Sequence, residues 1–242
     1  MSWSPETALL AALVIPLIGG VFVGLLGKMP NLREGATLTA AVLLALNVAY
    51  LVSVTGERPE LVYAIGDTGL AFGFKLEPLG ALFAAVASGL WIVNSLYSIG
   101  YMRGNNEPHQ TRFYVFFTIA IACAMGVALS SNLLTMFLFY EALTLSTYPL
   151  VAHKGDDKAR RGAAIYLAIL LGTSIGLLLP AIIATQFIAG STDFTVGGLL
   201  ASEASPLVAS VLLILFAFGI GKAALMPVHP WLPNAMVAPT PV

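Results

Sequence analysis

Charged residues are scarce in this 242-residue chain. Asp, Glu, Lys and Arg make up 10% of it, whereas soluble domains carry about 25%. Hydrophobic residues account for 58% of the chain, and its mean hydropathy is +0.90. The composition therefore predicts an all-α polytopic membrane protein. The net charge of −1, with no long basic run, gives no sign of nucleic-acid binding.

Cysteine is nearly absent as well. The single Cys123 excludes an internal disulfide and a thiolate-bound zinc or iron–sulfur centre. The sequence also lacks a Gly-rich phosphate loop, a His cluster with metal-ligand spacing and a nucleophile–base arrangement. We therefore expect no metal, no cofactor and no enzymatic site of the soluble kind. The N-terminus carries an acid and no base, so the first apolar segment is expected to be a retained span rather than a signal peptide.

Apolar segments, by contrast, are abundant. A spanning helix needs about 20 residues, and seven segments qualify. Between the second and third spans, 61–65 and 70–75 flank the glycine-rich 66–69 and predict a small β-hairpin, with an irregular loop as the alternative. The predicted spans are 8–27, 36–55, 79–101, 112–129, 132–152, 162–189 and 206–236.

Positive charges are distributed unevenly between the two sets of loops, and this bias predicts orientation. Eight basic residues fall on one side and two on the other, so the N-terminus and the hairpin are expected outside and loop 153–161 in the cytoplasm. The larger set is Lys28, Arg33, Arg103, Arg112, Lys154, Lys158, Arg160 and Arg161, and the smaller set is Arg58 and Lys75.

The seventh span is interrupted. The apolar run 206–218 leads into Lys222 and then into three prolines, Pro227, Pro230 and Pro233. Proline inside a helix removes a backbone donor and clashes with the preceding turn, so a discontinuous helix is expected. Unpaired backbone at membrane depth is tolerated only where it is buried in protein or lines a cavity, and a cation beside such a break is typical of an ion site.

Glu141 is the second charged residue deep within a span, near the middle of 132–152. Thr144 and Tyr148 follow it at positions i+3 and i+7, which gives one helix face a polar stripe. Glu141 and Lys222 could form a static buried ion pair. They could equally be a titratable pair, because burial disfavours the charged form of each while their attraction favours it. The helix break beside them favours the second hypothesis, a role in proton transfer.

Two histidines lie near these residues. His229 lies within the proline-rich break, where it could relay a proton or cap backbone carbonyls. His153 follows span 132–152, where it could be an interfacial residue or could support a proton path.

The motifs around these charges resemble those of a known family. Asn132–Val151, with Phe-Tyr-Glu and Thr-Tyr-Pro-Leu, resembles the fifth helix of the antiporter-like subunits of respiratory complex I and of Mrp-type multisubunit Na⁺/H⁺ antiporters. Lys222 with Pro227–Pro233 and Ala238–Val242 resembles the broken seventh helix and the turn into the eighth. Within the family, these motifs are most similar to those of the D-type Mrp protein.

This resemblance implies that Glu141 and Lys222 are the input pair of a proton path. Residues 1–111 would be the flanking helices with the hairpin, and 112–242 an incomplete first antiporter repeat. Family members have about fourteen helices, and the sequence ends where the eighth would begin. A naturally split subunit completed by a second polypeptide is the favoured explanation. A truncated product and a reduced structural subunit are the alternatives.

The resemblance also implies a function. It is that of a proton-translocating part of a multisubunit cation/proton antiporter in a bacterial inner membrane, with other membrane subunits as partners and with protons and Na⁺ as ions. Coupling to a redox or carbon-uptake complex, which would make the chain part of an enzyme, and a non-transporting scaffold are the competing hypotheses.

Overall fold

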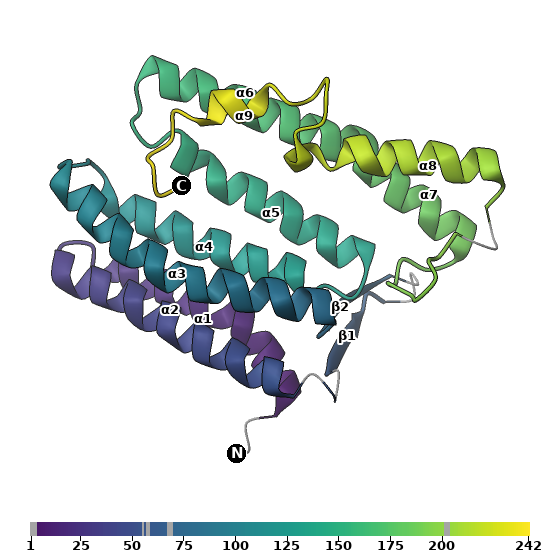
Figure 1. The fold of residues 1–242 in the computed structure, drawn as a ribbon, viewed down its shortest axis with the longest axis horizontal. Coiled ribbons are helices and arrows are strands. Elements are labelled where there is room, and N and C mark those ends of the chain that lie inside the picture. The colour runs from purple at the N-terminus through teal and green to yellow at the C-terminus, as the bar shows by residue number, and fades with distance from the viewer. Residues whose placement is uncertain (1–3, 55, 57–58, 67–69, 201–203) are drawn as a thin grey trace. The chain divides into compact units, whose positions relative to one another are not determined.

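The structure, a computed structural model, describes residues 4–54, 56, 59–66, 70–200 and 204–242. It confirms an all-α polytopic membrane protein (Figure 1). In the described ranges, six helices are long and apolar enough to cross a bilayer, and a seventh, α8, is apolar but shorter. They are α1 (Pro5–Leu25), α2 (Pro30–Ser53), α3 (Pro78–Gly104), α4 (Gln110–Ala128), α5 (Leu133–Val151), the helix Asp157–Ala189, and α8 (Pro206–Gly219).

The chain folds into two compact units. The first unit holds α1 to α4 together with Pro239–Val242, and the second holds the helices from α5 onward. The domain boundary expected between residues 111 and 112 concerns an internal repeat, and it stays a prediction.

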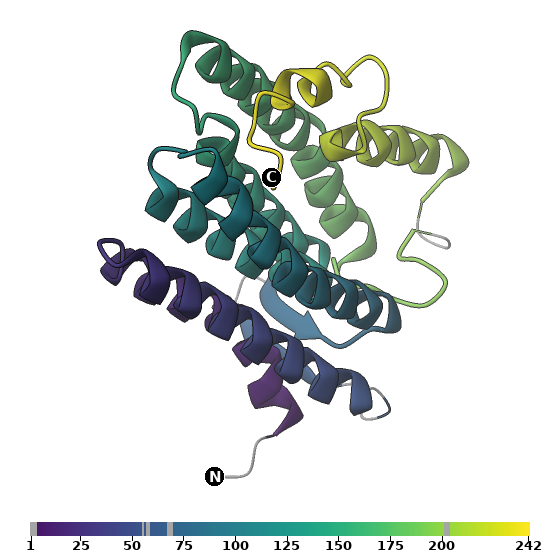
Figure 2. The ribbon, with the colours of Figure 1, turned by 60° about the vertical axis from the view of Figure 1, so that its left-hand side comes forward.

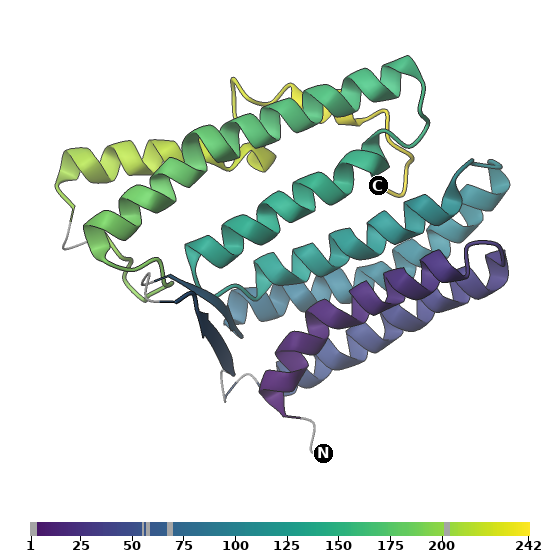
Figure 3. The ribbon, with the colours of Figure 1, turned by 180° about the vertical axis from the view of Figure 1, so that it is seen from behind.

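The first unit is built from closely packed helices. Helix α1 packs against α2 and α4, and α2 packs against α3 (Figure 3). Glycine allows close approaches here, since a Cβ on Gly19 would lie 2.6 Å from the Cβ of Ala40. The side-chain amide of Asn47 adds a hydrogen bond of 2.9 Å to the Ala8 carbonyl. Small residues and interhelical polar contacts therefore hold this unit together.

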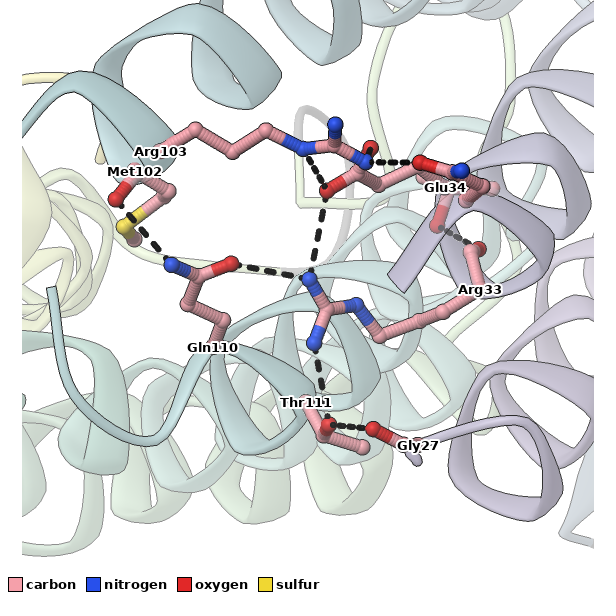
Figure 4. A network of polar contacts seen from close by, with 9 residues as sticks. Gly27, Arg33, Glu34, Met102, Arg103, Gln110 and Thr111 are labelled. Carbon is pink, nitrogen blue, oxygen red and sulfur yellow. Dashed lines mark hydrogen bonds and ion pairs between the residues drawn. The ribbon is translucent and has the colours of Figure 1, made fainter. Parts of the chain in front are cut away.

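A buried network of charges joins three helices of the first unit (Figure 4). Glu34 of α2 lies between Arg33 of the same helix, at 3.2 Å, and Arg103 of α3, which donates to it with two nitrogens. Arg33 and Glu34 are each 4% exposed. The sequence predicted both arginines in loops. The structure places them within the ends of α2 and α3, where their guanidinium groups have partners.

Helix α4 supplies the remaining partners of Arg33. Its guanidinium donates to the Gln110 side chain at 2.8 Å and to the Thr111 hydroxyl at 3.2 Å. It also lies over the Tyr114 ring, 5.1 Å from the centroid. Thr111 in turn donates to the carbonyl of Gly27, in the turn between α1 and α2. One arginine thus ties the ends of several helices together.

The predicted hairpin is present. Strands β1 (Glu60–Ala64) and β2 (Ala71–Lys75) form a two-stranded sheet, and the Ile65 N–H donates to the Leu70 carbonyl at 2.8 Å. Positions 67–69 of its predicted turn, and Arg58 before it, lie outside the described residues. The start of α5 is fixed beside β2, because Asn132 accepts from the Thr135 N–H and donates to the Ala71 carbonyl.

In the second unit, the predicted span 162–189 is one long helix with an irregular middle (Figure 3). Helix α6 (Asp157–Thr173) begins at Asp156, whose carboxylate caps the Ala159 N–H at 2.6 Å. The π-helical turn η2 (Ser174–Leu178) follows and continues into α7 (Leu179–Ala189). The length and apolar character of the segment predicted the span but not the π-turn.

The seventh helix is discontinuous, as expected, but the prolines do not end it. Helix α8 already stops at Gly219, and the short 3₁₀ turn η3 (Gly221–Ala223) carries Lys222. The chain then runs irregularly to α9 (Trp231–Ala235), which packs beside α6 (Figures 1 and 2). Pro227 and Pro230 lie in the irregular stretch and Pro233 lies within α9. The break therefore begins before the first proline.

Candidate functional site

Lys222 reaches from the broken helix to α5. Its Nζ donates to the Thr144 hydroxyl at 2.8 Å and lies 4.8 Å from the centroid of the Tyr140 ring. The 3₁₀ turn η3 places the side chain here, since the helix axis has already ended at Gly219. Lys222 thus contacts the polar stripe of α5 at Thr144. The predicted pairing of Lys222 with Glu141 stays a prediction.

Side chains satisfy the opened backbone at the break. The Lys222 N–H donates to the hydroxyl of Tyr140 at 3.1 Å, and the Trp231 indole donates to the Gly221 carbonyl at 2.8 Å. Trp231 is itself held edge-on to the Tyr166 ring of α6, at 5.7 Å between centroids. An interrupted helix is tolerated at membrane depth when its free groups find such partners.

Thr144 is fully buried and makes two different hydrogen bonds. Its hydroxyl proton goes to the Tyr140 carbonyl at 3.0 Å, one turn earlier, and its oxygen accepts from Lys222. A hydroxyl has one proton, so the side of Oγ1 facing Lys222 offers only lone pairs.

Glu141 has a different environment. Both carboxylate oxygens are buried, and neither accepts a hydrogen bond from any residue that the structure describes. The groups that act on the carboxylate electrostatically are the Ser174 hydroxyl and Lys222. The Ser174 hydroxyl has the Leu170 carbonyl as an acceptor at 2.8 Å. A buried carboxylate without donors is costly to keep ionised.

Ser174 begins the π-turn η2, so the irregular part of the long helix lies beside Glu141. Helix α8 also packs against this turn, and a Cβ on Gly219 would lie 2.6 Å from the Leu178 nitrogen. π-turns occur often at functional sites. Irregular backbone of two helices therefore meets near the buried acid.

The other predicted site residues lie apart from these contacts. Tyr148 packs in the cluster of α5, α6 and α9 that contains Tyr166. His153 follows the end of α5 and is 1% exposed, while His229 is exposed in the irregular stretch. Their part in a proton path stays a prediction. In the described ranges, no group of three or more His, Cys, Asp or Glu could hold a metal ion.

Sequence reasoning missed three residues of this site: Tyr140, Ser174 and Trp231. Tyr140 precedes Glu141 and Trp231 lies among the prolines, so both stood within the motifs already noted. Their hydrogen-bond partners are distant in sequence and become visible only in the fold.

The architecture defines the chain as a polytopic membrane protein with a broken helix, a glutamate whose carboxylate oxygens are buried and a partly buried lysine. Two family models match it. Residues 130–242 match the family described as NADH:quinone oxidoreductase/Mrp antiporter, transmembrane, and 62–114 match the N-terminus of complex I chain 5. The chain belongs to the antiporter-like subunit family that Mrp antiporters and complex I share.

Individual relatives agree with this assignment. NAD(P)H-quinone oxidoreductase chain 5 of Synechocystis is 32% identical over 73% of this chain and 27% of its own length. The Picosynechococcus chain 5 is 29% identical over 95% of this chain and 37% of its own length. Na⁺/H⁺ antiporter subunit A1 of Staphylococcus aureus is 30% identical over 72% of this chain and 22% of its own length. The chain thus spans well under half of these relatives, and the likeness to the D-type Mrp protein stays a prediction.

Two solved structures share the fold, each with a TM-score of 0.80 at 22% identity. One is a chain of the membrane-bound sulfane sulfur reductase, an archaeal respiratory membrane complex, matched over 96% of this chain and 48% of that one. The other is a chain of the Mrp complex from Dietzia, and the match covers 98% of this chain and 25% of that one.

Proposed function

We propose that this chain is a proton-translocating component of a multisubunit cation/proton antiporter and that Glu141 and Lys222 carry the proton. The observation that carries the proposal is the Glu141 carboxylate, which is buried on α5 without a hydrogen-bond donor among the described residues. A purely structural carboxylate would be expected to have such donors, because burying one without them is costly.

The chemistry follows from the two environments. Glu141 is least costly when it is protonated or when a cation approaches it, and Lys222 is the cation on the facing element. A proton that arrives at Glu141 removes the attraction for Lys222, and a proton that leaves restores it. Glu141 can therefore alternate between a protonated form without a salt bridge and an ionised form that pairs with Lys222. Ser174, which begins the π-turn, is a polar side chain next to Glu141.

We place this chain in a bacterial inner membrane, with the N-terminus outside and loop 153–161 in the cytoplasm. Membrane subunits of the same assembly are its proposed partners, and Na⁺ is the proposed counter-ion. The membership of the family, with its Mrp relatives, supports the proposed partners and counter-ion. The excess of basic residues on one side supports the orientation. The chain would act as a transporter component and not as an enzyme by itself.

A second candidate is the same proton path in a redox-driven assembly. The chain 5 relatives of NAD(P)H-quinone oxidoreductase favour it, as they are about as similar to this chain as the antiporter relatives are. The two candidates differ in the subunits that would assemble with the chain and in what drives the proton. In both candidates, Glu141 and Lys222 transfer the proton.

The test is proton movement in inverted membrane vesicles that carry the whole assembly. A fluorescent pH probe follows collapse of a proton gradient when NaCl is added, and formation of a gradient when a reduced electron donor is added. Glu141→Gln and Lys222→Met are expected to lower the rate at least tenfold. The matched controls are Glu77→Gln and Lys75→Met, which remove the partly exposed ion pair next to β2.

The outcomes separate the hypotheses. A response to NaCl supports antiport, and a response to the electron donor alone supports the redox-driven assembly. Transport that persists in Glu141→Gln, at unchanged levels of the assembly, contradicts proton transfer by this pair and favours a scaffold role.

A further inference from the structure

We propose that Tyr140 and Thr144 form a cation cradle on α5. This site binds the Lys222 ammonium and keeps it from pairing with Glu141 until Glu141 loses its proton. The inference rests on the proposed function, and it gives Tyr140 and Thr144 the role of positioning residues.

The cradle has three contacts from two residues one helical turn apart. The Thr144 oxygen accepts from Nζ at 2.8 Å, and the Tyr140 ring lies below Nζ with its centroid 4.8 Å away. The Tyr140 hydroxyl accepts from the Lys222 N–H at 3.1 Å. The backbone and the side-chain terminus of Lys222 are thus both fixed to α5.

The chemistry of the cradle favours the charged form of lysine. The Thr144 proton is already donated to the Tyr140 carbonyl, so Thr144 offers Lys222 an acceptor and no donor. The face of an aromatic ring attracts a cation through its quadrupole, and a neutral amine loses this attraction. Both contacts therefore hold Lys222 as an ammonium ion.

Glu141 is the competing partner for the same ammonium. It lies between the two cradle residues in sequence, and its oxygens accept no hydrogen bond in the part of the chain that the structure describes. One turn of α5 therefore carries two alternative sites for Lys222, and this conformation has the cradle occupied. A neutral Glu141 leaves Lys222 in the cradle, whereas an ionised Glu141 draws it out. The cradle thereby prevents a permanent salt bridge between Glu141 and Lys222.

Substitutions at Thr144 test this role against simple packing. Thr144→Val keeps the shape and removes the acceptor, while Thr144→Ser keeps the hydroxyl and removes a methyl group. Thr185→Val is the matched control, because Thr185 is also buried and its hydroxyl also donates to the carbonyl four residues earlier. All variants are measured in the assembled complex in inverted vesicles, as the rate of proton movement per amount of assembly.

We expect Thr144→Val to lower the rate roughly tenfold, since a hydrogen bond to a charged group is lost. Thr144→Ser and Thr185→Val should stay within about twofold of the unmodified assembly. A packing role predicts the reverse order at Thr144, with serine worse than valine, and that order would overturn the cradle. If Thr144→Val does not assemble, Thr144→Cys replaces it, because a thiol is a weak acceptor.

Glu141→Gln in the same vesicles separates this inference from the function on which it rests. Loss of transport in Glu141→Gln with full transport in Thr144→Val overturns the cradle alone. Transport that survives in Glu141→Gln overturns the proposed function and the cradle with it.

Discussion

Two glutamates of this chain carry buried carboxylates with opposite surroundings. Glu34 lies between two guanidinium groups that donate to both of its oxygens. The oxygens of Glu141 receive no donor from the residues that the structure describes. A carboxylate held by two guanidinium groups ties helices together, whereas a carboxylate without donors is costly to bury for structure alone. The contrast assigns Glu34 to structure and supports Glu141 as the residue that exchanges protons.

We expect Glu34→Gln to destabilise the first unit by about 3 kcal/mol, because it leaves Arg33 buried without a counter-charge. Glutamine has nearly the same shape, so the loss reports the charge and not the packing. The measurement is the thermal unfolding midpoint of the purified assembly in detergent.

Glu77→Gln is the control for this substitution. Glu77 pairs with Lys75 at 3.0 Å, but its side chain is 38% exposed, and such pairs contribute about 1 kcal/mol or less. Equal shifts of the midpoint in the two variants would contradict a structural role for the Arg33–Glu34–Arg103 network.

Among the elements, the interrupted seventh helix was predictable as a break but not in its position. The prolines indicated an interruption, because proline cannot continue a helix. The helix nevertheless ends at Gly219, where Tyr140 and Trp231 satisfy the backbone of Gly221 and Lys222. Those partners come from other elements, so local sequence carries no sign of where the break begins.

The apolar composition of the span did not predict the π-turn η2 (Ser174–Leu178). A local signal for it is Pro180, which has no N–H to donate to the Gly176 carbonyl four residues earlier. The contact between this turn and Gly219 is not visible in the sequence, since it depends on how α8 packs. The spans and the hairpin were predictable, but the contacts between distant segments were not.

The approach of α8 to η2 can be tested at Gly219. A Cβ there would lie 2.6 Å from the nitrogen and 2.8 Å from the Cα of Leu178, both of which are backbone atoms that cannot move aside. We expect Gly219→Ala to cost about 1–3 kcal/mol through overpacking. The measurement is again the thermal unfolding midpoint of the assembly.

Gly172→Ala is the matched control, since Gly172 lies in α6 and an added Cβ would meet nothing within 4 Å. Alanine is the better helix former, so this variant should be neutral or slightly more stable. A midpoint in Gly219→Ala that equals that of Gly172→Ala would show that α8 does not pack closely against the π-turn.

For the molecule as a whole, composition alone was sufficient to predict the class. Scarce charge and repeated apolar segments led to a polytopic membrane protein, because a bilayer excludes other compositions. Orientation is a property of the same scale, since it depends on charges summed over all loops. Arg33 and Arg103 still count among the basic residues of one membrane face, although they belong to a charge network. Arg33 lies at the start of α2 and Arg103 at the end of α3, and these two helix ends lie at the same face.

The orientation of the chain in the membrane can be tested by cysteine labelling. In a Cys123→Ala background, Glu77→Cys and Asp157→Cys place single thiols at a partly exposed and an exposed position on opposite sides. Eight basic residues against two predict that a membrane-impermeant maleimide labels position 77 in intact cells, and position 157 only after permeabilisation. The reverse pattern would invert the topology.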